Sequence, residues 1–472
     1  MSKALLILLM ISVSALTAQD NHYWTQQAGT RSSLMGGQVL GSVNDSSATY
    51  YNPGRLGYIK NENLRISADG YQIAGFTIAN GAGEGLDLES SQFDIVSIAS
   101  GGVFLFDGLP NHAFSYQVMT RQFFDANVSA RHQSRLNIID DTRSAGDETY
   151  IGTFNFNSDI EEYWAGIGWG YAINEHLGVG VSHFGVLRFD EFSFDTGTRA
   201  VSGDGTVRGL DNSVGSDYWN ARTLFKFGLA ANYEGWHFGL TVTTASLSLF
   251  GSSTVRRQST VFGIDDDGDG NETNFEANAH QVGLPNTYKS PWSFAFGVDW
   301  HFDNWIIASA WEWFLPVGKY TVIEAVDQPF LQGIPPVDTA KDFLSVTDGK
   351  RGVLNFGLAA DVQLNEEWHF MWSLRLDAAG DYLYEGDELT LGLSTWDLVH
   401  LTVGVTWLTL MENGLKKHEL NAGLQLSGGD AIVDQPINFD NPTESLFLLS
   451  TTETAELSYF GISFFFGYTY FF

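Results

Sequence analysis

The last thirteen residues of the chain alternate between two kinds of side chain. One parity carries Phe460, Ile462, Phe464, Phe466, Tyr468, Tyr470 and Phe472, and the other carries Gly461, Ser463, Phe465, Gly467, Thr469 and Phe471. Successive side chains of a β-strand point to opposite faces, so one face of this segment is wholly large and apolar. A soluble sandwich strand can show alternation, but it rarely needs seven large apolar residues on one face. The pattern therefore favours a strand with one face in lipid.

The same alternation recurs upstream in segments of about ten residues or fewer. It is present at 177–182, 292–301, 370–377, 399–407 and 420–427, with apolar residues on one parity and mostly small or polar residues on the other. Apolar residues facing out and polar residues facing in are typical of outer-membrane β-barrels. Tryptophans and tyrosines near the segment ends suit the interfacial girdles of such a barrel.

The connections between these segments alternate in length. Short turns fall at 107–111, 174–176, 234–236, 303–304, 365–367 and 412–417. Long polar stretches lie near 79–90, 135–157, 198–217, 263–288, 326–348, 381–394 and 428–455. Short periplasmic turns and long external loops are expected of a barrel, and the count gives about fourteen antiparallel strands with both ends periplasmic. The soluble alternative, an exported protein of two β-sandwiches, does not explain this rhythm.

The composition agrees with a lipid-facing wall. Only 17% of the residues are charged, which is below the usual quarter for a soluble domain. The 56 acidic residues outnumber the 24 basic ones and give a net charge of -32, which argues against a nucleic-acid partner. Charges are costly on the lipid face, so we expect the acidic excess in the external loops. The absence of cysteine excludes disulfide scaffolds and cysteine metal sites.

Residues 1–18 have the features of a secretory signal peptide. Lys3 precedes an apolar stretch, and small residues follow, with cleavage expected after Ala18 or after Ala15. Beyond residue 18 no run approaches the roughly 20 apolar residues that a membrane-spanning helix needs. A closed barrel is the other arrangement that satisfies the backbone in lipid. The sequence thus predicts an all-β fold, a transmembrane β-barrel over 61–472 in the outer membrane of a Gram-negative bacterium.

Residues 19–60 do not alternate and are rich in turn-forming residues. They also hold apolar residues that need a partner, among them Leu34, Met35, Tyr50 and Leu56. About forty ordered residues ahead of a barrel of this size would fit inside its lumen. We therefore expect an N-terminal plug.

Two motifs in this segment resemble a known family. The run Gly-Thr-Arg-Ser-Ser-Leu-Met-Gly-Gly at 29–37 and the run Tyr-Asn-Pro-Gly-Arg-Leu at 51–56 are similar to the hatch of FadL/TodX-type transporters of hydrophobic compounds. The similar part covers residues 28–57, and Gly54 stands where the family usually has alanine. The resemblance implies a fourteen-stranded barrel. The hatch motif residues are Gly36, Gly37, Asn52, Pro53 and Gly54.

The resemblance also implies a function. Hydrophobic compounds such as long-chain fatty acids would be taken up by passive diffusion, past the hatch and out through a lateral opening in the wall. The alternative is a FadL-like barrel that serves as a secretion-system or surface-attachment component and binds protein substrates. The expected partners are a hydrophobic small molecule, outer-membrane lipid and lipopolysaccharide, and the barrel assembly machinery, whose signal the terminal strand ending in Phe472 resembles. We expect a monomer.

A lateral opening requires a strand that stops pairing locally, which glycine permits. The candidates are Gly75 in the first expected strand and Gly101 with Gly102 in the second. The other interpretation of these glycines is that they only accommodate the curvature of the barrel.

One external connection resembles a calcium-binding loop. Residues 265–276 fit the pattern D-x-D-x-D-G followed by five residues and Glu. Oxygen ligands at alternate positions converge on a hard cation such as Ca²⁺. The predicted ligands are Asp265, Asp267, Asp269, Asn271 and Glu276. A solvated acidic turn is the equal alternative, and no other cofactor is expected.

Catalytic motifs are missing from the sequence. It contains no G-x-S-x-G, H-E-x-x-H or P-loop pattern. Charges on the inward parity, such as Lys226, Asp299, Arg375 and Asp377, are expected to line a polar interior. We therefore predict that the protein is not an enzyme.

Overall fold

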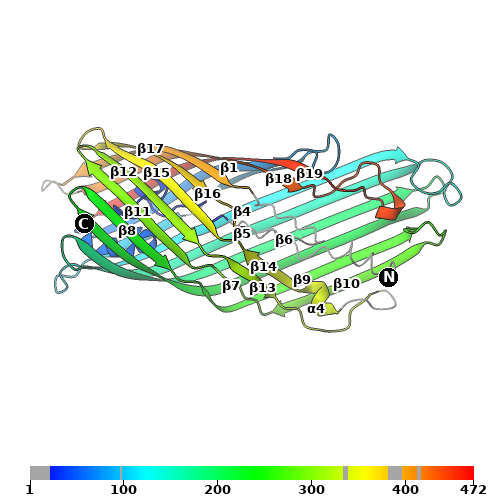
Figure 1. Cartoon of the computed structure of the whole chain (residues 1–472), viewed down its shortest axis with the longest axis horizontal. Coiled ribbons are helices and arrows are strands. Elements are labelled where there is room, and N and C mark those ends of the chain that lie inside the picture. Colours follow the sequence, from blue (N-terminus) through cyan, green and yellow to red (C-terminus); the bar gives the residue numbers. More distant parts are fainter. Residues whose placement is uncertain (1–21, 96–97, 333–338, 381–395, 412–415) are drawn as a thin grey trace.

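The computed structural model describes residues 22–95, 98–332, 339–380, 396–411 and 416–472 (Figure 1). The predicted signal peptide and the predicted connection at 381–394 lie outside these residues. Within them, every helix is too short or too polar to cross a bilayer.

Fourteen antiparallel strands form a closed barrel, as the sequence predicts. Three of the fourteen consist of two successive pieces. In chain order they are β1 (Asn63–Ile78), β2 (Leu88–Ile95) with β3 (Ile98–Phe104), β4 (His112–Leu136), β5 (Glu148–Ala172), β6 (Leu177–Val201), β7 (Val207–Tyr233), β8 (Trp236–Thr243) with β9 (Leu247–Ile264), β10 (Thr273–Leu284) with β11 (Ser293–Phe302), β12 (Trp305–Phe314), β15 (Val353–Gln363), β16 (Trp368–Asp377), β17 (Leu398–Leu410), β18 (Lys416–Asp434) and β19 (Thr454–Phe471). Pairing of β1 with β19, from Asn63–Phe471 to Ile78–Leu457, closes the barrel.

The predicted alternation sets which side chains face out. In β19, Phe460, Phe464 and Phe466 are exposed, as the lipid-facing parity should be. Glycines of the opposite parity, such as Gly467, point inward and lie against the segment that fills the lumen. The outer surface is therefore an apolar wall, which is the surface of an outer-membrane barrel.

One side of the barrel is much taller than the membrane. Strands β4 to β7 are 25–27 residues long, whereas about ten residues suffice to cross a bilayer. Figure 1 shows these strands running the length of the molecule, past the shorter β12, β15 and β16. The extension forms a wall that rises on the side of the long connections.

The outward side chains change from aromatic to charged where the tall strands leave the membrane. Phe189 and Trp219 lie opposite each other in β6 and β7. Two residues further from the short turns, four carboxylates face one another across β4 to β7: Asp125, Asp159, Glu191 and Asp217. Charged side chains are costly against lipid, so this row marks the outer boundary of the membrane.

Three connections predicted from the sequence, at 135–157, 198–217 and 263–288, are shorter in the structure because the strands of the tall wall extend into them. The residues that join the strands are only 137–147, 202–206 and 265–272. Outward positions above the boundary are polar, for example Asn127, Asn157 and Ser193. The strands thus continue while the apolar alternation stops, and this polar composition made them look like loops.

Two insertions lie at the outer end of the barrel. One is a small sheet of β13 (Val317–Ile323) and β14 (Val346–Lys350) with helix α4 (Ala340–Leu344). The other is the connection between β18 and β19, residues 435–453, which contains η2 (Glu444–Leu446) and which we call the strap. Both contribute buried apolar residues to cores that also include residues of the barrel wall.

The predicted plug occupies the opposite end of the lumen. It contains α2 (Thr30–Leu34), α3 (Ala48–Tyr51) and η1 (Pro53–Tyr58), which Figure 1 shows in blue inside the barrel near the C-terminus. We call residues 29–60 the hatch and residues 22–28 the leading segment. Nearly all of both are buried.

Candidate functional site

The Asn-Pro-Gly motif fixes the hatch to the inner wall. The Asn52 side-chain oxygen accepts a hydrogen bond from Gly54 N at 3.0 Å and so caps η1. The Asn52 amide donates to Leu40 O at 2.9 Å in the hatch and to Leu229 O at 3.0 Å in β7. Pro53 packs on Gly180, where the wall leaves no room for a Cβ atom. The motif is thus a docking element whose partners are glycines of the barrel.

The Gly36-Gly37 pair of the hatch motif makes a turn that other residues disfavour. Both have positive φ, 57° and 80°, a region in which glycine has no Cβ penalty. A Cβ on Gly36 would lie 2.6 Å from Ser373 Oγ of β16. The five predicted hatch residues therefore lie at contacts inside the hatch or between hatch and wall.

Buried ion pairs also hold the hatch. Arg65 of β1 is fully buried and lies 3.2 Å from Asp45 and 2.5 Å from Gln117 Oε1. Arg31 pairs with Asp361 of β15 at 2.8 Å. Each pair joins a hatch residue to a strand, so the hatch is bonded to the barrel on several sides.

The leading segment, which the sequence analysis included in the plug, crosses the lumen above the hatch. A β-bulge in β4 between Thr120 and Gln122 allows two successive side chains to point inward. Arg121 donates to Tyr23 O, and Gln122 donates to His22 O at 3.0 Å. On the other side Asp377 accepts from Tyr23 N at 3.2 Å.

On one side of the leading segment lies a cavity, which we call the cationic pocket. Its charged lining consists of five cations and two carboxylates, namely Arg121, Arg222, Lys226, Lys289, Lys350, Glu162 and Glu312. Its aromatic lining consists of Tyr23, Tyr50, Trp164, Tyr288 and Phe314. The pocket thus combines an apolar body with an excess of positive charge.

Two guanidinium nitrogens in this pocket lack a hydrogen-bond partner among the described residues. Glu162 accepts from Arg222 at 2.5 Å and lies 3.4 Å from Arg188. The Nη1 atoms of Arg121 and Arg222 are buried without a hydrogen-bond partner among the described residues. An unsatisfied buried donor is costly, and a carboxylate is its strongest acceptor. The pocket is therefore suited to an anionic head group.

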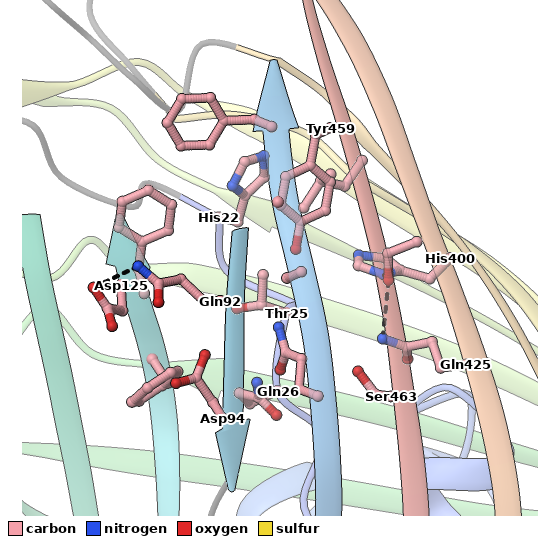
Figure 2. A pocket seen from close by; sticks show the side chains of 18 of the residues that line it. His22, Thr25, Gln26, Gln92, Asp94, Asp125, His400, Gln425, Tyr459 and Ser463 are labelled. Atoms are coloured by element: carbon pink, nitrogen blue, oxygen red, sulfur yellow. Dashed lines mark hydrogen bonds between the residues drawn. The ribbon is translucent and has the colours of Figure 1, made fainter. Parts of the chain in front are cut away.

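On the other side of the leading segment, against the barrel wall, lies a second cavity, which we call the wall pocket. Figure 2 shows His22, Thr25 and Gln26 of the leading segment on one side of it and Asp94 and Asp125 on another. Phe76, Trp396 and Tyr459 add apolar surface. The leading segment thus separates the two cavities.

The wall is interrupted at this pocket. β4 pairs with β3 from Phe104 to Ser100, and none of the described pairings joins β4 to β2. Instead Gln92 donates to Asp125 at 3.4 Å (Figure 2), and Asn127 N donates to Ser90 Oγ at 3.2 Å. Side chains therefore replace the backbone ladder between β2 and β4.

The glycines proposed for an opening lie in different places. Gly75 pairs with Ser91 of β2 and lines the wall pocket. Gly101 and Gly102 lie in β3 and pair with both β1 and β4. Only Gly75 is therefore beside the interruption.

The predicted calcium ligands are partly together. The carboxylates of Asp265, Asp267 and Asp269 have oxygens within 4.8 Å of one another in the β9–β10 turn. Glu276 lies in β10, and its carboxylate accepts a hydrogen bond from Thr260 at 2.5 Å. Asn271 N donates to Asp269 at 2.8 Å. The calcium site stays a prediction.

The inward charges have different roles. Lys226 lines the cationic pocket and donates to Thr243 at 3.0 Å. Arg375 donates to Thr25 O at 3.1 Å, so it supports the leading segment, as Asp377 does. Asp299 is buried against Gly41 of the hatch, where a Cβ would lie 2.9 Å from its carboxylate.

Comparison with solved structures identifies this architecture. A FadL homologue of Pseudomonas aeruginosa superimposes with a TM-score of 0.57 and 10% identity, over 95% of this chain and 99% of that one. The toluene transporter TodX of P. putida gives 0.54 and 12%, over 95% and 99%. TbuX of Ralstonia pickettii, also a toluene transporter, gives 0.52 and 12%, over 94% and 98%.

The chain has the FadL/TodX fold. Comparison of the sequence with protein-family models and with curated proteins gave no match. The resemblance seen in the hatch motif thus extends to the whole barrel in structure. At 10–12% identity, this likeness establishes the fold.

Proposed function

We propose that the protein is an outer-membrane channel for the uptake of compounds with an apolar body and an anionic head, such as long-chain fatty acids, by passive diffusion. The observation that carries this proposal is the pair of unpartnered guanidinium nitrogens of Arg121 and Arg222 in an aromatic cavity beside the hatch. A neutral hydrocarbon would leave both nitrogens desolvated and unsatisfied. A carboxylate would accept hydrogen bonds from both.

We propose further that the compound leaves sideways through the interruption between β2 and β4. The interruption begins beyond Val118 of β4, on the membrane side of the carboxylate row at Asp125, so its lower part faces lipid. The wall pocket lies directly behind this interruption, and two side-chain contacts, Gln92–Asp125 and Ser90–Asn127, span it. Movement of side chains alone opens such a gap, whereas a paired strand would have to lose its ladder.

The alternative role in secretion or surface attachment requires a broad external surface, and the tall wall of β4 to β7 supplies one. A binding component of that kind has no need of an internal cavity beside the hatch. The cationic pocket is the reason for preferring transport.

A binding measurement tests the head-group assignment. Dodecanoate and dodecanol have the same chain and differ in charge, so calorimetric titration of the purified protein with each separates the two contributions. We expect dodecanoate to bind at least about tenfold more tightly, because a hydrogen bond to a charged group contributes about 1.5–3 kcal/mol. In Lys226→Met that preference should fall, whereas Lys60→Met, at an exposed position, should keep it. Equal affinities would refute the assignment.

A second measurement tests the lateral route. The chain has no cysteine, so Gln92→Cys/Asp125→Cys can be joined by a short reducible thiol cross-linker without side reactions. We expect uptake of dodecanoate by cells to stop on cross-linking and to return on reduction, while binding to the purified protein persists. Uptake that continues at the same rate through the sealed gap would exclude this route.

A further inference from the structure

The strap folds into the barrel. Its apolar side chains are buried on the inner face of the tall wall. The β4–β5 and β9–β10 turns form polar contacts with it. The buried strap residues are Ile437, Phe439, Phe447 and Leu448, and their wall neighbours in the same core include Phe154, Phe156, Phe192 and Phe194. Figure 1 shows the strap, in orange to red, towards the end of the barrel opposite the C-terminus. The strap thus occupies the part of the lumen that the tall wall encloses, at the end opposite the hatch.

The wall is shaped to receive the strap. Gly152 of β5 faces the Phe439 ring so closely that a Cβ there would overlap it. Tyr150 Oη donates to Leu448 O at 2.9 Å, and Thr198 Oγ1 donates to Phe447 O at 3.0 Å. Two successive carbonyls of the strap are therefore satisfied by two neighbouring strands.

The tip of the strap is a compact unit under backbone strain. Phe447 and Leu448 both have positive φ, 55° and 62°, which costs free energy in residues other than glycine. The unit closes on itself, because Leu448 N donates to Thr443 O at 2.8 Å and Thr443 N donates to Leu449 O at 3.1 Å. Residues 443–449 can therefore leave the wall as one body and keep these bonds.

A polar contact fastens this unit at the rim. Glu444 accepts from the Arg143 guanidinium in the β4–β5 turn and from Asp265 N, at 3.2 Å, in the β9–β10 turn. At the other end of the strap, Phe439 N donates to Ala82 O of the β1–β2 turn at 3.1 Å. The strap thus reaches across the mouth from one side of the barrel to the other.

The strap also lies on the path to the inner cavities. The core that it completes includes Phe76 and Trp396, which line the wall pocket, and Tyr459 packs against that core and lines the pocket as well. A compound that arrives from outside meets the strap before it meets the pocket.

We infer that the strap is a displaceable gate over an outer binding site for apolar chains, latched by the Glu444–Arg143 pair. The inference rests on the proposed uptake function. Phe439, Phe447 and Leu448 occupy the phenylalanine-lined site, and the apolar part of the ligand takes their place when the strap swings out. The unit keeps its internal hydrogen bonds in that state, so opening breaks only its contacts with the wall and the rim.

Cross-linking across the latch tests the gate. In the cysteine-free chain, Arg143→Cys/Glu444→Cys can be joined at the cell surface by a short reducible bifunctional thiol reagent. The matched control is Asn137→Cys/Asp141→Cys, a pair of exposed residues that contact each other within the β4–β5 turn. Heat-modifiable migration on gels verifies that each variant is a folded barrel.

We expect uptake of dodecanoate to fall at least tenfold when the latch pair is cross-linked and to recover on reduction, with less than a twofold change in the control. Before cross-linking, the latch pair and Glu444→Gln should take up dodecanoate at least as fast as the parent. Unchanged uptake through the cross-linked latch would overturn the gate. Absence of uptake in every form, including the parent, would instead refute the proposed function.

Discussion

The hatch fills the end of the lumen at the short turns and the strap lies at the opposite end, and different interactions hold the two in place. The hatch is joined to the strands by buried ion pairs and by the Asn52 amide. The strap is held by apolar packing, by hydrogen bonds to Tyr150, Thr198 and Ala82, and by one ion pair at the rim. Buried polar bonds cost much when broken singly, whereas apolar contacts tolerate sliding and exchange for another apolar group. The comparison suggests that the hatch is fixed and that the strap is replaceable.

The largest expected effect is in the hatch. Arg65→Met leaves the buried Asp45 carboxylate without its guanidinium and should lower the free energy of unfolding by about 3–5 kcal/mol. Urea titration of the reconstituted barrel, followed by tryptophan fluorescence, measures it. Arg256→Met, at an exposed position of β9, is the matched control and should change little. A loss of similar size in both variants would show that the hatch pair has no special role.

Next in size is a change in the strap. Leu448→Ala removes a fully buried side chain, and such truncations cost about 2–5 kcal/mol. We expect the loss to appear as faster hydrogen exchange in residues 435–453 while the hatch keeps its protection, because the strap opens locally. Equal acceleration in strap and hatch would mean that the two regions open together and would break the comparison.

The same substitution, tyrosine to phenylalanine, can remove hydrogen bonds that hold either region. Tyr51→Phe in the hatch removes a hydroxyl that donates to Gln27 Oε1 and accepts from Ala28 N, both at 2.9 Å. Tyr150→Phe removes only the bond to the strap at Leu448 O. A typical hydrogen bond contributes about 0.5–1.5 kcal/mol, so Tyr51→Phe should destabilise more. The urea midpoints of the two variants measure the difference, and the reverse order would contradict it.

The smallest effect concerns the β9–β10 turn beside the latch. If Asp265, Asp267 and Asp269 bind Ca²⁺, saturating calcium should raise the melting temperature of the parent by an amount set by its affinity. Asp267→Ala should abolish that shift, and Asp204→Ala, in the exposed β6–β7 turn, should preserve it. If calcium leaves the melting temperature of the parent unchanged, the turn is a solvated acidic loop.

Much of the barrel could be predicted from residues alone. The alternation in β19 gave the lipid-facing parity, and the motif at Asn52 gave the hatch, because both signals are local and periodic. The extent of β4 to β7 was missed, because strands above the membrane carry polar residues on the outward face, such as Asn127 and Asn157.

The two cavities lay beyond sequence reasoning for a different reason. Arg121, Arg222 and Lys350 come from strands far apart in the chain, and only barrel closure brings them to one pocket. The leading segment carries no motif. The bulge at Thr120–Gln122 that supports it cannot be recognised from the alternation of residues in a single sequence. The strap was predicted as part of a polar connection, because its apolar residues, such as the run 446–449, do not alternate as those of a strand do.

The β1–β19 seam has a consequence for the order of assembly. The last strand to be made pairs with the first, so closure of the barrel joins the two parts of it that are most distant in the chain. Thr30 of the hatch packs on Gly467, within that last strand. The hatch is synthesised before every strand, and it has to be in the lumen when the seam forms. The hatch is therefore a template around which the barrel shuts, as well as a stopper inside it.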